Sequence, residues 1–375
     1  MTEIFETDTV VIGAGIIGLA VAARQAQKGQ DVILLESGHA IGDGVSGRNS
    51  GVLHAGIYYP ANSLKAKLCV RGLNLLYDYC KTAAVPFNAC GKWIVATSDE
   101  EAATLSAIRD KAAANGTVPL EWLTRDAIRE QEPELKIREA LFSPATGIVD
   151  APALMTSLLG QVEDRGGMLA LDAPVLSLTP EGSGFQINVG GSHPARIKAM
   201  RVINAAGLGA IPLAEKLDWY PSTLVPAPLL AKGNYFKLSG KAPFSHLIYP
   251  VPEKGGLGVH ATLDMGGQIR FGPDVEWLPE GCNPHEHLKV SEDRKLHFVE
   301  SVSRYWPGVT ADRLDPDYVG IRPKIKPPEG QDSADFVIQA ETEHGFKGLV
   351  QLFGIESPGL TSCLALAEHV SDFLD

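Results

Sequence analysis

The sequence predicts an α/β protein in two parts: a parallel sheet surrounded by helices, and a second part built on an antiparallel sheet. Three observations support this fold class. A glycine-rich turn joins a buried strand to an alanine-rich helix within residues 7–36, and a later apolar strand ends in Ala205-Ala206-Gly207. Residues 216–315 instead alternate β-branched and aromatic residues between glycine turns, as antiparallel strands do. The length of 375 residues allows two or three such parts.

The N-terminal turn has the spacing of a dinucleotide-binding motif. Val10–Ile12 is a short apolar run typical of a parallel strand, and Gly13, Gly15 and Gly18 follow it at GxGxxG spacing before a helical stretch. Gly13 allows a sharp turn, Gly15 allows backbone N–H groups to approach a pyrophosphate, and Gly18 allows close contact between helix and strand. The segment therefore predicts a dinucleotide site.

The residue at the end of the next strand narrows the choice of dinucleotide. Val32–Leu35 is apolar and ends in Glu36, whose carboxylate can accept hydrogen bonds from a ribose diol. An acid at this place disfavours the 2′-phosphate of NADP, whereas FAD and NAD both contain the adenosine diphosphate that the motif recognises. A second complete motif is absent from the sequence, so we expect one bound dinucleotide.

Composition excludes several other classes of protein. Lys and Arg total 33 against 45 Asp and Glu, and the net charge of −12 argues against nucleic acid as a partner. Five scattered cysteines without a CxxC pair fit a reducing compartment. The longest uncharged stretch, Thr9–Ala23, is too short to span a bilayer and lacks the basic residues of a secretory leader. We expect a soluble, cytoplasmic protein, with peripheral membrane contact left open.

Three further segments carry a resemblance to a known family. They are SGRNSGVLHAGIYYP (46–60), RVINAAGLGA (201–210), and the C-terminal pair YVGIRPK (318–324) and LFGIESPGLTSCLALAEHV (352–370). With the N-terminal motif, and in this order, they resemble the FAD-dependent D-amino acid oxidase superfamily, also called the glycine oxidase or DadA-like group. The HAGIYYP and GIRPK strings are most similar to its L-2-hydroxyglutarate dehydrogenase/oxidase branch.

The resemblance implies non-covalently bound FAD and a discontinuous, Rossmann-like FAD-binding domain. That domain would comprise residues 1–85, 145–215 and 316–375, and an α+β substrate domain on an antiparallel sheet would comprise 86–144 and 216–315. Within the substrate domain we expect a strand at 92–97, helices at 99–115 and 124–130, and strands at 234–238, 247–251, 257–263 and 268–272. Gly255-Gly256 and Gly266-Gly267 mark hairpin turns, and residues 324–332 mark an exposed loop.

The C-terminal segment and the loop at 46–60 complete the expected cofactor site. A helix starting near Gly359 could direct its positive N-terminal end at the flavin ring. The residues expected to contact the cofactor are Gly13, Gly15, Ile16, Ile17, Gly18, Glu36, Ser46, Asn49, Ser50, Gly51, Ala206, Gly207, Gly354, Gly359, Leu360 and Thr361.

Oxidation of a 2-hydroxy acid requires a cation for the carboxylate and a base for the hydroxyl proton. Arg322 resembles the family position whose guanidinium binds the α-carboxylate, and a planar fork suits that task. His54 and His260 are the candidate bases, because imidazole titrates near neutral pH; each could equally be a structural histidine. His260, Tyr249 and Lys324 are further candidates for contacting the substrate.

Several other residues have a weaker connection to the chemistry. Lys232, Tyr58 and Tyr59 could line the site, but packing explains them equally well. Cys282, His285 and His287 lack the spacing of zinc ligands, so we expect an exposed polar loop there and no metal.

We therefore expect an FAD-dependent oxidoreductase that converts a small 2-hydroxy acid, such as L-2-hydroxyglutarate, to the 2-oxo acid. An oxidase or dehydrogenase of an amino acid or of an opine-like secondary amine is the alternative, and a flavin-binding protein without turnover is a third. The electron acceptor stays open among oxygen, a quinone and an electron-transfer protein.

Overall fold

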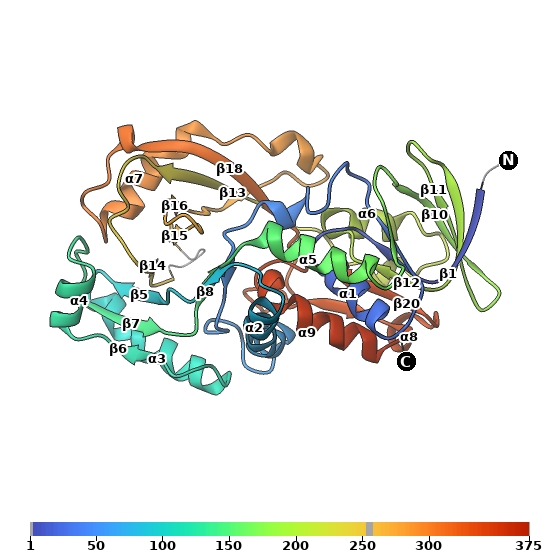
Figure 1. Cartoon of the computed structure of the whole chain (residues 1–375). Coiled ribbons are helices and arrows are strands. Elements are labelled where there is room, and N and C mark those ends of the chain that lie inside the picture. Colours follow the sequence, from blue (N-terminus) through green and yellow to red (C-terminus); the bar gives the residue numbers. More distant parts are fainter. Residues whose placement is uncertain (1–2, 253–257, 375) are drawn as a thin grey trace.

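The computed structural model describes residues 3–252 and 258–374 (Figure 1). The described residues form three sheets, which we call the first sheet (eight strands), the second sheet (nine strands) and the third sheet (three strands). In Figure 1 the first sheet and both chain ends lie to the right, and the second sheet lies to the left. The two-part α/β organisation predicted from the sequence is confirmed.

The first sheet has a parallel centre around the N-terminal strand. Val10 pairs with Ile33 on one side and Val202 on the other, and Val202 also pairs with Leu349. The segment near residue 201 therefore returns to the N-terminal sheet, as its apolar pattern and Ala-Ala-Gly ending indicated. The strands are β1 (Glu3–Ile12), β2 (Val32–Leu35), β9 (Met168–Ala170), β10 (Val175–Glu181), β11 (Gly184–Val189), β12 (Ala195–Asn204), β19 (Val337–Gln339) and β20 (Leu349–Phe353).

Helices pack on this sheet and against one another. The C-terminal helix α9 contacts both α1 and α2, which joins the two ends of the chain. Gly72 makes the α2–α9 contact close, because a Cβ there would lie 2.3 Å from the carbonyl oxygen of Thr361. The helices of this part are α1 (Ile16–Gln27), α2 (Leu64–Thr82), α5 (Ala151–Glu163), α6 (Ala210–Glu215), α8 (Glu341–His344) and α9 (Gly359–Asp372).

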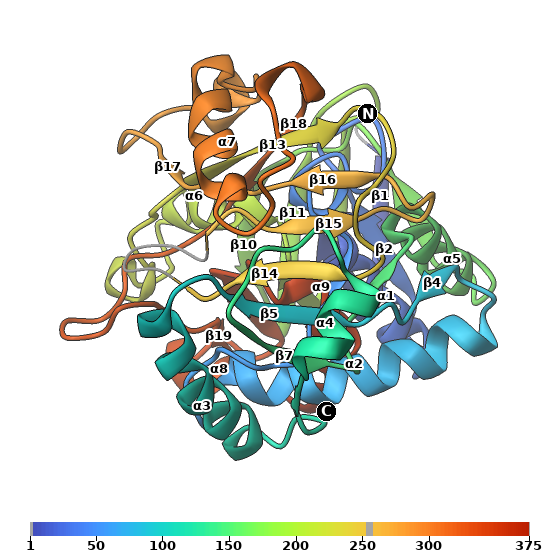
Figure 2. The same ribbon diagram turned by 90° about the vertical axis from the view of Figure 1, so that its left-hand side faces the viewer.

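The second sheet is the antiparallel platform expected from residues 216–315, extended by residues from 92–143. Its order is β17-β13-β16-β15-β14-β5-β7-β6, with β18 on β13, and only β14–β5 is parallel among its recorded pairs. Figure 2 faces this sheet and shows β16, β15, β14 and β5 side by side. Its strands are β5 (Lys92–Ala96), β6 (Glu121–Trp122), β7 (Glu139–Ser143), β13 (Ala231–Leu238), β14 (Leu247–Pro250), β15 (Ala261–Leu263), β16 (Ile269–Phe271), β17 (Glu276–Trp277) and β18 (Leu314–Arg322).

Capping side chains fix the starts of two helices near this sheet. The Ser98 and Thr124 side chains accept hydrogen bonds from the backbone N–H groups of Glu101 and Ala127, and so cap the next two helices. These helices are α3 (Asp99–Ala114) and α4 (Arg125–Gln131), while α7 (Lys295–Ser303) packs farther along the sheet.

Two details differ from the prediction. The strand expected at 257–263 is shorter, because β15 begins at Ala261; residue 257 and the Gly255-Gly256 turn lie outside the described residues. The domain boundary proposed at 316 falls inside β18, whose residues pair with β13. Residues 316–322 thus belong to the second sheet, and local apolar alternation could not show which partner strand they choose.

A small third sheet lies where the two larger ones meet. It joins β3 (Val52–Leu53) to β8 (Gly147–Val149), which also pairs with β4 (Phe87–Asn88). Short 3-10 turns cover Val45–Gly47, Gly207–Gly209, Ser222–Leu224, Pro284–His287, Glu292–Arg294 and Ala311–Arg313.

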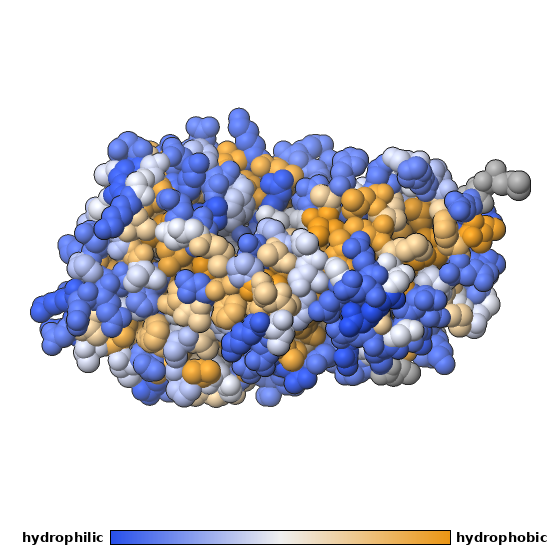
Figure 3. All heavy atoms as spheres, in the orientation of Figure 1, coloured by the Kyte–Doolittle hydropathy of each residue, from blue (hydrophilic) through white to orange (hydrophobic). Residues whose placement is uncertain are grey.

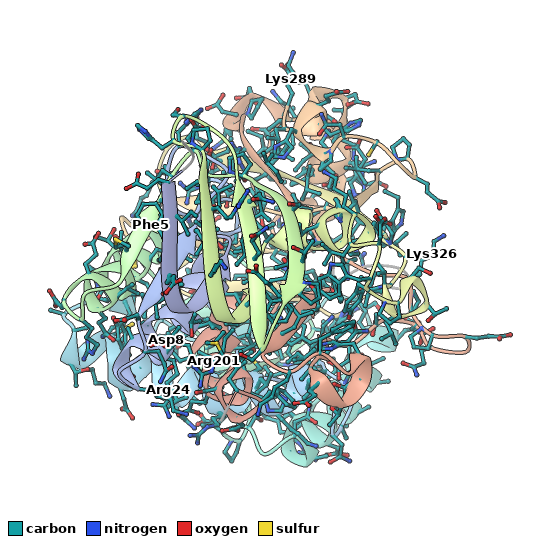
Figure 4. All side chains as sticks on the ribbon, turned by 90° about the vertical axis from the view of Figure 1, so that its right-hand side faces the viewer. Phe5, Asp8, Arg24, Arg201, Lys289 and Lys326 are labelled. Carbon is teal, nitrogen blue, oxygen red and sulfur yellow. The ribbon has the colours of Figure 1, made fainter. Side chains whose placement is uncertain are left out.

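Exposed apolar side chains occur on three strands of the first sheet. Ile4 on β1, Leu176 on β10 and Met200 on β12 are 56%, 63% and 47% exposed, and Figure 3 shows apolar surface over this sheet. Figure 4 faces the same sheet, where Arg201 bonds the side chain of Gln30 and the carbonyl oxygen of Leu374. None of the helices in the described part of the chain is long and apolar enough to span a membrane.

Candidate active site

A cavity of about 500 Å³ lies between the first and second sheets. Its wall is formed by segments far apart in the sequence: the turn at 13–17, the loop at 36–54, residues 205–209, strands of the second sheet, residues 320–322 and residues 352–360. The start, middle and end of the chain thus meet at one site.

The glycine turn is built for close approach. Gly13 has φ +102°, and a Cβ there would lie 2.6 Å from the carbonyl oxygen of Ala205. A Cβ on Gly15 would lie 2.8 Å from the Ser46 hydroxyl, and one on Gly18 would lie 1.8 Å from the Gly13 carbonyl oxygen. The structure therefore confirms the tight turn at Gly13 and the close helix–strand contact at Gly18. Gly18 allows this helix–strand contact but does not itself line the cavity.

Glu36 joins the turn to the loop that follows. Its carboxylate accepts hydrogen bonds from the backbone N–H groups of Ala14 and Gly38, each at 2.8 Å, and it lines the cavity. A carboxylate has about four acceptor positions, so these bonds orient Glu36 and leave capacity for a ribose diol.

The loop around residues 46–54 is held by its own polar side chains. The Ser46 hydroxyl accepts a hydrogen bond from the Ile16 N–H at 2.9 Å, and the Asn49 side chain accepts one from the Gly51 N–H at 2.8 Å. The hydroxyl groups of Ser50 and Tyr235 lie 3.0 Å apart. These hydrogen bonds hold the loop against the glycine turn on one side and against Tyr235 of the second sheet on the other, and the loop lines the cavity between them.

The first turn of α9 reaches the cavity from the C-terminal side. Residues 355–360 line it, and the N-cap residue Pro358 makes no capping side-chain bond. The unpaired N–H groups of a helix start attract negative charge. Thr361 supports this turn without lining the cavity: its hydroxyl accepts from the His54 N–H at 2.9 Å and donates to the Val52 carbonyl oxygen at 3.3 Å.

Arg322 enters the cavity from the end of β18. Its guanidinium donates to the backbone carbonyl oxygen of Asp274, while the Asp274 carboxylate pairs with Arg294 at 2.7 Å. Within the described residues Arg322 has no carboxylate partner. The remaining donors of a planar fork of this kind suit a ligand carboxylate.

His54 lies where the 46–60 loop meets the tail. Its Nε2 is 3.3 Å from the Ser357 hydroxyl. Burial, followed by the nearby charge of Lys92, lowers the pKa of His54 to about 3, so the ring is neutral near pH 7. A neutral imidazole can accept a proton, and an arriving carboxylate would raise its pKa.

His260 and Tyr249 form a stacked pair on the cavity wall. Their ring centroids lie 3.6 Å apart with planes inclined at 12°, and both residues are buried. Burial also raises the pKa of Tyr249, so its hydroxyl stays protonated.

Lys92 was not predicted as a site residue, yet it lies directly behind this pair. Its ammonium is 4.7 Å from the centre of the Tyr249 ring and 4.9 Å from that of Tyr58, and the side chain is 1% exposed. Burial lowers its pKa to about 7. A lysine that opens an otherwise apolar strand, KWIVA, is the signal that could have identified it.

Lys324 lies outside the main cavity. Its ammonium pairs with Glu356 at 2.6 Å, and Lys65 pairs with the same carboxylate at 2.9 Å. Burial opposes ionisation of Glu356, but the two lysines outweigh it and its pKa is lowered. Lys324 and Gly354 instead line a second space of about 140 Å³. We therefore leave Lys324 out of the substrate-binding set.

Most of the residues predicted for the site line the cavity. They are Gly13, Gly15, Ile16, Ile17, Glu36, Ser46, Asn49, Ser50, Gly51, His54, Ala206, Gly207, Tyr249, His260, Arg322, Gly359 and Leu360. Lining residues that the sequence did not single out for the site include Tyr235, Pro273, Val275, Leu288 and Glu356. His285, expected only in an exposed loop, also touches the cavity. Among the described residues no cluster could hold a metal ion.

The donor set fits a dinucleotide that contains adenosine diphosphate. The glycine turn leaves room where a Cβ would collide, α1 begins at that turn, and Glu36 faces the same space. The five cysteines do not line the cavity, which agrees with a cofactor held without a thioether bond.

Comparison with known proteins identifies the dinucleotide. Residues 8–373 match the model of the DAO family, described as FAD dependent oxidoreductase. The chain is 41% identical to the mitochondrial L-2-hydroxyglutarate dehydrogenase of Arabidopsis thaliana, covering 97% of this chain and 83% of the plant protein. It is 29% identical to L-2-hydroxyglutarate dehydrogenase of Escherichia coli K12, covering 97% and 92%.

Solved structures share the fold. FAD-bound L-α-glycerophosphate oxidase from Mycoplasma pneumoniae has a TM-score of 0.88 at 22% identity, covering 98% of this chain and 94% of that one. Glycine oxidase from Geobacillus kaustophilus has a TM-score of 0.80 at 20% identity, covering 99% and 95%. With a family match over nearly the whole chain and a cavity that fits its cofactor, this protein is a member of the DAO family of FAD-dependent oxidoreductases.

Proposed function

We propose that the enzyme oxidises a small 2-hydroxy acid, with L-2-hydroxyglutarate as the leading candidate, to the corresponding 2-oxo acid. The observation that carries the proposal is Arg322, a cation on the cavity wall without a carboxylate partner in the described part of the chain. The plant relative, 41% identical, is named for this substrate.

The chain's own residues would bind the substrate and receive one proton. Arg322 binds the α-carboxylate, and neutral His54 takes the hydroxyl proton as the C–O bond becomes a carbonyl. The hydrogen on the α-carbon leaves with two electrons, and bound FAD supplies the acceptor for that hydride. His260 is the second candidate base, and its stacking on Tyr249 fixes its ring plane.

An anaerobic titration tests the proposal. The yellow holoenzyme is mixed with L-2-hydroxyglutarate, D-2-hydroxyglutarate, L-lactate and L-glutamate, and flavin absorbance is followed. We expect the L-hydroxy acid to bleach the flavin. Bleaching by L-glutamate with release of ammonia would support the amine alternative, and no bleaching by any 2-hydroxy acid would refute the substrate class.

Arg322 and the histidines can be tested separately. Arg322→Met should lower kcat/KM for L-2-hydroxyglutarate by at least about 100-fold, because a charged donor to the carboxylate is lost. Arg313→Met, which removes an arginine near the far end of β18 and outside the cavity, is the matched control. His54→Gln should lower kcat more than His260→Gln if His54 is the base; the reverse order would assign that role to His260.

The acceptor and the location belong to the same proposal. Turnover with oxygen, with a quinone analogue and with a dye that accepts electrons would separate an oxidase from a dehydrogenase. All five cysteines are free, which supports a reducing, cytoplasmic compartment, whereas the plant relative is named mitochondrial. Cell fractionation, with a carbonate wash to release peripheral protein, would decide location and membrane contact.

A further inference from the structure

We propose that Lys92 binds the distal carboxylate of the substrate and so selects a dicarboxylic over a monocarboxylic 2-hydroxy acid. This inference rests on the proposed function and extends it, since it assigns a second anion site to the same cavity. Its basis is a buried ammonium whose surroundings provide aromatic faces but no counter-ion.

The environment of Lys92 is described by four neighbours. Tyr58 and Tyr249 present ring faces at 4.9 and 4.7 Å, while Cys69 of α2 and His54 are close enough to interact electrostatically. Across the described residues the ammonium makes no hydrogen bond or ion pair. A buried charge without a partner is costly, so a site that retains one gains most when an anion arrives.

The neighbours stay neutral in the physiological range. Burial raises the pKa of Cys69 to about 12 and raises those of Tyr58 and Tyr249, while the pKa of His54 falls to about 3 through burial and the charge of Lys92. Lys92 is therefore the group of this cluster that titrates near pH 7. A substrate carboxylate would therefore be the negatively charged partner that these neutral neighbours do not supply to Lys92.

Two other cations of the second sheet, one buried and one half-buried, already have partners. Lys232, 5% exposed, bonds Ser291 at 2.6 Å and pairs with Glu276 at 3.2 Å. Arg270 pairs with Asp317 at 2.6 Å. Arg322 and Lys92 differ from them, because their positive charges lack carboxylate partners among the described residues. Arg322 on the cavity wall and Lys92 behind Tyr249 of the same wall are two cations for the two carboxylates of a dicarboxylic acid.

Contacts connect Lys92 to the cavity itself. Tyr249 and His54, two of its neighbours, line the cavity, and β5 pairs with β14 so that Lys92 lies opposite Leu247, two residues before Tyr249. Lys92 does not itself line the cavity, so a distal carboxylate would approach its ammonium past the edge of the Tyr249 ring.

The test measures selectivity and binding separately. L-2-Hydroxyvalerate has the same five-carbon chain as L-2-hydroxyglutarate but a methyl group in place of the distal carboxylate. In Lys92→Met the ratio of kcat/KM for the diacid to that for the monoacid should fall at least about 30-fold, mainly through KM. Lys232→Met removes a buried lysine that has its own partners, and its ratio should match the wild type.

Binding of acids that cannot react keeps this test independent of turnover. Binding of glutarate and of valerate is followed through the absorbance of the bound flavin, and the wild type should bind glutarate more tightly. Above pH 7 the Kd for glutarate should rise about tenfold per pH unit, because the free ammonium deprotonates. Lys92→Arg should keep the preference and lose this pH dependence; Lys92→Met should lose the preference.

Each outcome is decisive. Equal binding of glutarate and valerate by the wild type, or an unchanged selectivity ratio in Lys92→Met, overturns the assignment of Lys92. An equal fall in kcat for both acids would make Lys92 a proton-transfer group and would also overturn it. Failure of every hydroxy acid to reduce the flavin, with glutarate still preferred, would refute the proposed reaction and leave the anion site intact.

Discussion

Replacing Lys92 by Met should stabilise the protein, even though it impairs substrate selection. Burial lowers the pKa of Lys92 from its usual 10.5 to about 7, so the folded state resists protonation while the unfolded chain accepts the proton. At about 1.4 kcal/mol per pH unit, the difference amounts to about 5 kcal/mol of lost stability below pH 7. Met has similar length and carries no charge to bury.

The sign of the pH dependence follows from linkage. Between pH 7 and 10.5 the unfolded state binds more protons at this lysine than the folded state does, so the stability of the wild type rises with pH in that window. The advantage of Lys92→Met should therefore be largest at pH 6 and shrink by about 1.4 kcal/mol per unit above pH 7.

Urea unfolding of the holoenzyme, followed by tryptophan fluorescence at pH 6, 7, 8 and 9, measures this difference. Lys237→Met, at an exposed position of β13, is the control and should change stability little at any pH. An advantage that does not vary with pH, or a variant less stable than the wild type at pH 6, would refute the argument that Lys92 is buried as an unpaired charge.

Three further changes test the cofactor site. Gly13→Ala should yield colourless protein, because Gly13 has φ +102° and a Cβ there would lie 2.6 Å from the Ala205 carbonyl oxygen. The control is Gly160→Ala in α5, where a Cβ meets nothing within 4 Å. It should keep the flavin and add about 1 kcal/mol to the free energy of unfolding. Glu36→Gln should weaken FAD binding roughly 10-fold or more, since a charged acceptor for two backbone N–H groups is lost, and flavin release on dilution measures it; an unchanged Kd would contradict this. Thr361→Val should lower the free energy of unfolding by about 1–3 kcal/mol, because the half-buried His54 N–H loses its acceptor, whereas Thr361→Ser should restore it. Equal denaturation midpoints for both variants would count against this.

Local sequence patterns predicted those parts of the fold that are themselves local. The strand, turn and helix at residues 7–36 form as expected, because apolar runs and glycine spacing act over a few residues. The return of residues 201–207 to the same sheet was also predictable, since small residues at a strand end favour close contact with a cofactor turn.

Pairing between distant segments was less predictable. Arg322 and Lys324 are two residues apart in the sequence, yet Arg322 faces the cavity and Lys324 pairs with Glu356 beside Lys65. Lys92 was treated as an ordinary strand start, because nothing nearby in sequence shows that Tyr58 and Tyr249 enclose it. Likewise, the choice of β13 as the partner of β18 depends on contacts some 80 positions away. Such choices are made by packing across the whole chain.

The meeting of residues 13–17 and 355–360 at one cavity has a consequence for biosynthesis. On the ribosome, the nascent polypeptide can form its glycine turn early, but the cavity wall formed by residues 355–360 is missing until that segment has been made. A prematurely terminated chain would then bind flavin only if the cavity could retain it without the wall formed by residues 355–360. Flavin absorbance of the purified product would report that synthesis had passed residue 360, since chains stopped before residue 355 could not close the site.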